Sequence, residues 1–131
     1  AVVLRAKLPH IDVYNQERRR VAHRYSEKLS AMGIQTPHED GIGLHVYHQY
    51  TLLTDAREKI QQALAAHQIA SAIYYPVPLH QQKVFADISA GQSFPIAESV
   101  SQRCLSLPIY PELTNESIDE ICEVIRQALT S

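Results

Sequence analysis

Apolar residues recur at alternating steps of four and three along the first quarter of the chain. The positions with this spacing are Leu4, Leu8, Ile11, Asn15, Arg18, Ala22, Tyr25, Leu29 and Met32. Such steps keep side chains on one face of an α-helix, so the pattern predicts a long helix within residues 1–33. Pro9 removes a backbone hydrogen bond and clashes with the preceding turn, so we expect a kink or short break near residues 7–9. Gly33 is expected to end the helix.

Polar residues interrupt the apolar face of this helix. Asn15 and Arg18 occupy positions where a core would hold aliphatic side chains. Either the face is buried only at its ends, or these two residues meet polar groups of another domain. The run Arg18–Arg20, with Arg24, could contact phosphates, but such a run is more often a solvated or inter-domain face.

Two later stretches are predicted to be strands. Residues 44–54 alternate and are rich in Val, Tyr, Thr and Leu, and residues 69–75 are apolar and β-branched. In the first strand His45 and His48 would lie on opposite faces, which disfavours a shared metal site. A helix capped by Thr54 or Asp55 connects the strands. The two strands are expected to be neighbours or to flank a third.

The second strand leads into a stretch that contains two prolines. Pro76 and Pro78 fix the backbone and disfavour helix before them, which predicts a stiff extended connection. Such a connection would hold Tyr75 at its base and His80 at its tip over a cleft. The alternative is a plain extended connection at a sheet edge.

The rest of the chain alternates between helix and strand. We expect a short helix at 81–91, a helix from Phe94–Pro95 and a strand at 105–108. The helix after Pro95 would bury Ile96, Val100 and Cys104. The last helix begins at Thr114 as N-cap and buries Ile118, Ile121, Cys122, Ile125 and Leu129. The fold class is therefore α/β, of the α+β type.

Composition and charge narrow the class of protein. A length of 131 residues with 45 % hydrophobic residues predicts one domain with a core of its own. Residues 1–33 carry seven Lys or Arg against three Asp or Glu, although the whole chain has a net charge of -2. A basic excess confined to one helix indicates a partner surface, possibly another domain, and not a nucleic-acid binder. The sequence starts at Ala1 inside a helical pattern, which predicts that it is part of a longer protein.

Several other classes of protein and site are not signalled. No apolar run is long enough for a membrane span and no signal peptide is present, so neither membrane association nor export is expected. Cys104 and Cys122 form no Cys-x-x-Cys motif, which predicts reduced thiols in the cytoplasm. Cys104 is expected to be a core residue.

The usual catalytic motifs are missing from the sequence. It has no glycine-rich phosphate loop, paired-carboxylate motif or nucleophile elbow. All four lysines fall on expected helix surfaces, so none is a natural Schiff-base candidate. They are Lys7, Lys28, Lys59 and Lys83.

Four segments, taken together and in order, resemble the C-terminal domain of the DegT/DnrJ/EryC1/StrS family, pyridoxal-phosphate aminotransferases that act on nucleotide-linked keto-sugars. They are residues 1–8 with 19–25, residues 45–50 with Arg57, residues 75–81, and residues 105–113. The resemblance implies the small domain of a fold-type I aminotransferase over residues 1–131. In it, residues 1–33 form an inter-domain helix, and helices cover a small, mainly antiparallel sheet.

The resemblance also implies where the chemistry lies. Family members hold the Schiff-base lysine and the other groups that bind pyridoxal phosphate in an N-terminal domain, which this sequence does not contain. The chain would then supply no catalytic, cofactor or metal residue, but one wall of the sugar-nucleotide pocket, with His80, Tyr75 and His48 as substrate-binding candidates. The isolated chain would be inactive.

Partners follow from the same resemblance. They are a nucleotide-linked keto-sugar, an amino-acid donor such as glutamate, and a second subunit in a homodimer. The implied role is amino-sugar biosynthesis, for lipopolysaccharide, other surface glycans or glycosylated metabolites. The alternative is a free-standing small-molecule binding or regulatory domain without catalysis.

Overall fold

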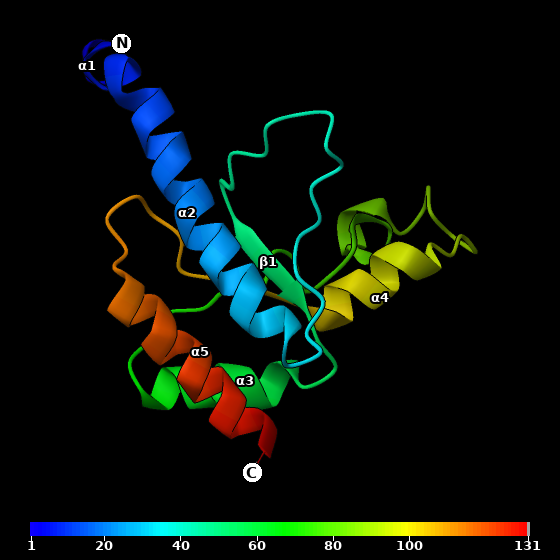
Figure 1. Ribbon diagram of the computed structural model, residues 1–131. Helices are drawn as coiled ribbons and strands as arrows, with labels where there is room; N and C mark the ends of the chain where they lie inside the picture. The colour runs from blue at the N-terminus through cyan, green and yellow to red at the C-terminus, as the bar shows by residue number, and fades with distance from the viewer. Residues whose placement is uncertain (131) are drawn as a thin grey trace.

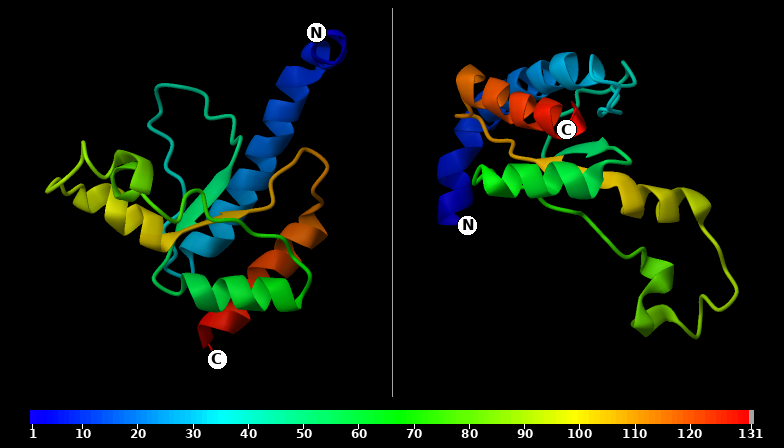
Figure 2. Two further views of the ribbon diagram at one scale, coloured as in Figure 1. Left: turned by 180° about the vertical axis from the view of Figure 1, so that it is seen from behind. Right: turned by 90° about the horizontal axis from the view of Figure 1, so that it is seen from below.

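The structure, a computed structural model, describes residues 1–130. Its elements in order are α1 (Val2–Lys7), the 3-10 turn η1 (Leu8–His10), α2 (Ile11–Ser30), β1 (Tyr50–Leu53), α3 (Arg57–Ala66), the 3-10 turns η2 (Leu79–Gln81) and η3 (Lys83–Phe85), α4 (Pro95–Arg103), β2 (Cys104–Leu107) and α5 (Asn115–Thr130). Helices α2 and α5 lie side by side on one face of the sheet, and α3 packs against α5 (Figures 1 and 2). The predicted α+β class is confirmed.

The N-terminal helix breaks where the proline predicts it. Helix α1 ends at Lys7, a 3-10 turn containing Pro9 follows, and α2 starts at Ile11 in a new direction (Figure 1). Gly33 ends the helical region with a φ of +77°. The next residue, Ile34, is buried and donates its backbone N–H to the carbonyl of Leu29 at 3.2 Å, which satisfies a helix-end acceptor.

Only the second half of this helical region is buried. Val21, Ala22, Tyr25 and Leu29 are in the core, whereas every residue from 1 to 13 is exposed. Asn15 and Arg18 are half-buried and bind one another, and Arg18 also donates to the carbonyl oxygen of Val46 at 3.2 Å. The two polar residues therefore mark the place where the helix leaves the domain.

The sheet is small and antiparallel. Strands β1 and β2 pair with Tyr50 opposite Leu107 and Leu53 opposite Cys104. Single antiparallel bridges add Gln35 beside β1 and Ala72 beside β2. The stretch around Ala72 and β1 therefore flank a third strand, one of the two expected arrangements. The predicted strand at 69–75 is wrong in length, because only Ala72 exchanges backbone hydrogen bonds with Ser106.

The predicted strand at 44–54 is also too long. Residues 44–49 are irregular, and Tyr47 has a φ of 47°, which breaks the alternation and turns both Tyr47 and Tyr50 into the core. Local bonds hold this conformation: the N–H of Tyr47 donates to Nδ1 of His45, and the carboxylate of Asp40 accepts from the N–H of Ile42. Such bonds give the backbone an alternative to a sheet ladder.

The C-terminal half supplies the rest of the core. Thr114 caps α5 as predicted, because its Oγ1 accepts the N–H of Ser117 at 3.2 Å. The predicted stripe of α5 is buried, with Leu129 packed against the core at its edge. The core joins this stripe to Ile60 and Leu64 of α3 and to Tyr25 of α2.

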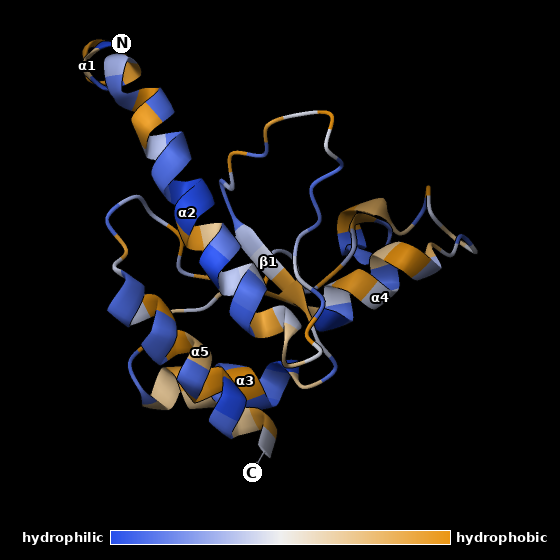
Figure 3. Cartoon of the chain, in the orientation of Figure 1, coloured by the Kyte–Doolittle hydropathy of each residue, from blue (hydrophilic) through white to orange (hydrophobic). Residues whose placement is uncertain are grey.

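The expected buried face of α4 is wrong. Ile96 is 81 % exposed and Val100 39 % exposed, and Ser101 is the buried residue of this helix. Cys104 is buried, as expected for a core residue, but it begins β2 instead of ending the helix. Helix α4 projects from the domain together with residues 74–94, so part of its apolar surface has no covering layer (Figures 2 and 3). The predicted helix at 81–91 is wrong, because the chain there forms only the end of η2 and the 3-10 turn η3.

Candidate functional site

A groove of about 610 Å³ lies between α4 and residues 74–94, and we call it the α4 groove. Its walls are mostly apolar and aromatic, with a few polar groups. The residues that line it include Tyr74, Tyr75, Val77, His80, Gln82, Phe85, Ser89, Gln92, Phe94 and Val100. A concave site of this size with a few polar groups fits a small-molecule ligand.

The chain builds this groove by leaving the sheet and folding back. Pro76 and Pro78 keep the backbone extended after Ala72, and the two 3-10 turns then reverse its direction. The hydroxyl of Ser89 donates to the carbonyl oxygen of His80 at 2.9 Å. This bond fixes the returning segment of the chain to the outgoing segment. The prolines therefore set the groove's near wall, and α4 forms its far wall.

Tyr75 and His80, the first two predicted site residues, both line this groove. Tyr75 is 73 % exposed at its rim. The side chain of His80 is only 11 % exposed, and its Nε2–H donates to Oε1 of Glu98 at 2.9 Å. Its ring lies 4.9 Å from that of Phe94, centre to centre. His80 is thus held inside the groove and not free at the tip of a rod.

Glu98, in the first turn of α4, is the acceptor at the centre of this arrangement. Its Oε1 also accepts the backbone N–H of Phe94 at 2.8 Å and the hydroxyl of Ser93 at 3.3 Å. The Phe94 N–H, followed by His80, holds the pKa of this carboxyl below its ordinary value. Glu98 is therefore ionised at neutral pH, and Nε2 of His80 carries the proton that it donates.

His48, the third predicted residue, lies in a different hollow. That hollow has a volume of about 580 Å³ and is formed by the loop before β1 and by the start of that strand, with Pro37, Leu44, Tyr47 and Thr51 among its lining residues. His48 is exposed there and precedes β1 instead of standing on it. The structure brings Tyr75 and His80 together but not His48.

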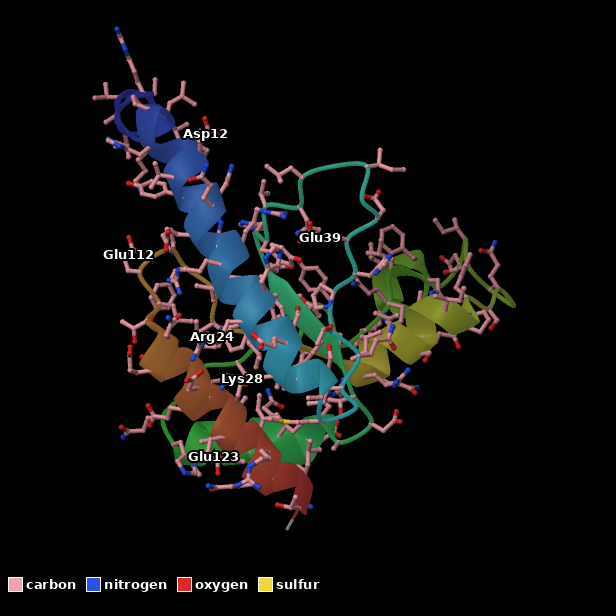
Figure 4. The ribbon with its side chains drawn as sticks, in the orientation of Figure 1. Asp12, Arg24, Lys28, Glu39, Glu112 and Glu123 are labelled. Carbon is pink, nitrogen blue, oxygen red and sulfur yellow. The ribbon has the colours of Figure 1, made fainter. Side chains whose placement is uncertain are left out.

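The arginines of α2 hold the domain's own loops. Arg19 donates to Glu39 at 3.0 Å and to the carbonyl oxygen of His45 at 2.7 Å, and Arg20 donates to the carbonyl oxygen of Leu113 at 2.8 Å. Arg24 binds both carboxylate oxygens of Asp119, at 2.8 and 2.6 Å. Figure 4 shows Arg24 and Lys28 on the side of α2 that faces α5. These arginines therefore bind groups of the domain itself, and a further role of this face toward another domain stays a prediction.

Glu39 anchors the long loop between α2 and β1 (Figure 4). Its carboxylate accepts the hydroxyl of Tyr47 and Nε2–H of His23, each at 2.7 Å, besides Arg19. These bonds, that of Tyr47 first, lower the pKa of Glu39 to about 2. Glu39 also borders a small hollow formed by residues 38–45.

The residues present do not form a site for pyridoxal phosphate. Lys28 is paired with Asp119 at 3.2 Å, and the other three lysines are exposed on α1, α3 and η3. Within residues 1–130, no lysine lines any of the three hollows described above. No group of three or more His, Cys, Asp or Glu in that range could hold a metal ion. No helix in it is both long enough and apolar enough to cross a membrane.

A family model settles what kind of chain this is. Residues 1–126 match the model of the DegT/DnrJ/EryC1/StrS aminotransferase family. The chain belongs to this family. It is 48 % identical over 129 residues to UDP-N-acetyl-3-dehydro-alpha-D-glucosamine 3-aminotransferase of Acidithiobacillus ferrooxidans, covering 98 % of this chain and 35 % of that protein. It is 35 % identical to UDP-2-acetamido-2-deoxy-3-oxo-D-glucuronate aminotransferase of Pseudomonas aeruginosa, covering 90 % and 33 %.

Solved structures of the family have the same fold. A DegT DnrJ EryC1 StrS aminotransferase from Brucella abortus has a TM-score of 0.88 and 34 % identity, covering 95 % of this chain and 34 % of that one. DesV from S. venezuelae, solved in complex with a ketimine intermediate, has a TM-score of 0.89 and 32 % identity, with the same coverage. The chain thus spans about a third of the length of the relatives it matches.

Sequence reasoning missed Glu98 and Phe94. The only sign of Glu98 was an acidic residue in the first turn of the helix that Pro95 begins, where an acid is favourable for the helix alone. Its bond to His80 joins residues eighteen positions apart. That bond forms only because the proline segment folds back.

Proposed function

We propose that this chain is one part of a pyridoxal-phosphate-dependent aminotransferase that acts on a nucleotide-linked keto-sugar, and that the α4 groove forms one wall of the sugar-nucleotide site. The observation that carries this proposal is the similarity to the A. ferrooxidans enzyme over nearly the whole chain. The cofactor would be held by residues outside this chain, since none of the lysines in residues 1–130 lines the groove.

The residues that line the groove indicate which part of the substrate it would bind. Tyr75 places an exposed aromatic ring at the rim, and His80 places a hydrogen-bonding ring inside. No Lys or Arg is among the residues that line it, so it offers no cation for a diphosphate. The groove therefore suits an uncharged part of the substrate, held by ring contact and hydrogen bonds. His48 lies in the hollow of about 580 Å³ and does not line this groove.

The names of the relatives suggest a finer assignment. The substrate would be a UDP-linked 3-keto sugar that carries an acetamido group. From the family resemblance alone, the amino donor would be glutamate, and the enzyme would be a homodimer in the cytoplasm. The product would enter the biosynthesis of lipopolysaccharide or another surface glycan.

Amino transfer by the full-length protein tests the proposal. The UDP-3-amino sugar and 2-oxoglutarate should be converted to the 3-keto sugar and glutamate, which mass spectrometry detects. A dTDP-linked 3-amino-6-deoxyhexose serves as the comparison substrate. Turnover of the dTDP sugar alone would refute the UDP assignment. No turnover of either, together with tight binding of a UDP-sugar, would favour the alternative of a binding or regulatory protein.

A further inference from the structure

The segment that forms the α4 groove has little hydrophobic burial to hold it. From residue 74 to residue 100 no side chain is fully buried. Leu79, Val84 and Ile88 are each more than two-thirds exposed. A segment with so few buried contacts opens easily unless specific polar bonds hold it. The shape of the groove therefore depends on hydrogen bonds.

One carboxylate oxygen accepts three of those bonds. Oε1 of Glu98 accepts from Nε2–H of His80, from the backbone N–H of Phe94 and from the hydroxyl of Ser93. We call this set the Glu98 cluster. It joins the outgoing chain at His80 to the start of α4, and it holds the His80 ring against that of Phe94. Hydrogen bonds to an ionised acceptor are about twice as strong as neutral ones.

We propose that Glu98 is a positioning residue for substrate recognition: it closes the α4 groove and fixes the His80 ring with its proton on Nε2. In the tautomer that carries its one ring proton on Nε2, Nδ1 is a hydrogen-bond acceptor. The group that His80 can recognise is thus a hydrogen-bond donor, such as a sugar hydroxyl or an acetamido N–H. This step rests on the proposed function, but the role of Glu98 in the shape of the groove does not.

Hydrogen exchange of the full-length protein without ligand tests whether Glu98 fixes the shape of the α4 groove. Glu98→Ala should raise amide exchange across residues 79–94 at least fivefold, because three bonds are lost. Glu98→Gln keeps an acceptor oxygen and should restore most of the protection. The matched control is Glu123→Ala, which removes a carboxylate bound to Arg126 and Gln127 on α5. It should leave residues 79–94 unchanged. Unchanged exchange in Glu98→Ala would overturn the proposal.

Kinetic measurements on the same variants separate a positioning role of Glu98 from a general loss of stability. Glu98→Ala should lower kcat/KM for the UDP-keto-sugar half-reaction about tenfold or more, mainly through KM, and leave the glutamate half-reaction within about twofold. Glu98→Gln should recover most of the loss. Equal losses in both half-reactions would overturn the proposal.

His80→Gln tests the acceptor itself. Glutamine can keep the donor to Glu98 in the place of Nε2, but its one acceptor, the carbonyl oxygen, does not occupy the position of Nδ1, so exchange should stay low while the keto-sugar half-reaction falls about tenfold. Full activity in His80→Gln would contradict the assigned role. A wild-type protein without aminotransferase activity would refute the proposed function, while the exchange results would still decide the role of Glu98 in the groove.

Discussion

Replacement of Tyr75 by alanine is the cleanest single change at the α4 groove. The side chain is 73 % exposed, so the substitution removes a ring at the rim and leaves the core intact. Exposed substitutions of this kind shift the free energy of unfolding by less than about 0.5 kcal/mol. Any loss of function in Tyr75→Ala should therefore reflect lost substrate contact.

The expected size of the loss follows from the free area of the ring. A tyrosine side chain covers roughly 200 Å². With 73 % of the residue exposed, about 150 Å² is open to a ligand. If bound substrate covers about half of that, roughly 75 Å² at about 25 cal/mol per Å² gives about 2 kcal/mol. This corresponds to a loss of about 30-fold in kcat/KM for the keto-sugar half-reaction.

Stopped-flow measurement of the two half-reactions of the full-length protein checks this value. Tyr75→Ala should slow only the keto-sugar half-reaction, and Tyr75→Phe, which keeps the ring, should lose less than about tenfold, the scale of one hydrogen bond. Thermal melting of both variants serves as the folding control. An unchanged keto-sugar half-reaction with an unchanged Tm would refute the placement of substrate at the groove's rim.

Three further predictions concern stability and the cofactor. Ile125→Ala, in the core, should lower the free energy of unfolding by about 2–5 kcal/mol in urea titration, whereas Ile96→Ala, at an 81 % exposed position, should change it by less than about 0.5 kcal/mol. The bonds of Glu39 lower its pKa to about 2 from an ordinary value of 4.5. Its contribution to the free energy of unfolding is therefore present above pH 4.5 and is lost as the pH falls toward 2. Glu39→Gln should flatten this part of the plot of unfolding free energy against pH, and an unaltered slope would count against Glu39 as the anchor of the loop. Borohydride reduction of this chain mixed with pyridoxal phosphate should leave its mass unchanged; stoichiometric labelling of one lysine would show a cofactor site that the arrangement of residues 1–130 does not provide.

Elements with a strong local signal could be predicted from the sequence. The break at Pro9, the end of the helix at Gly33 and the cap at Thr114 each depend on the chemistry of one residue, and all three are confirmed. The apolar spacing of α5 also sufficed, because its stripe faces α3 within one domain.

The failures occur where tertiary contacts override the local pattern. Residues 44–49 have the composition of a strand, but the positive φ of Tyr47 and the bonds of His45 and Asp40 bend them into a loop. The apolar spacing of α4 does not show that the helix projects from the domain. The buried face predicted there is consequently exposed at Ile96.

The candidate site was predictable in part for the same reason. Two prolines were enough to place Tyr75 and His80 on one stiff segment, and both line the same groove. The return of that segment to Glu98 depends on contacts between residues far apart in sequence. The assignment of His48 to the same site depends on a strand over residues 44–54, but β1 begins only at Tyr50, and His48 lies in the hollow of about 580 Å³ and not in the α4 groove.

A crystal structure of the full-length protein with the UDP-amino sugar bound tests the central claim most directly. We predict that the sugar nucleotide lies against Tyr75 at the rim of the α4 groove, and that Nδ1 of His80 accepts a hydrogen bond from a sugar hydroxyl or acetamido N–H while Nε2 stays bound to Glu98. A sugar nucleotide bound away from the groove, with another part of the protein filling the space between α4 and residues 74–94, would contradict the account.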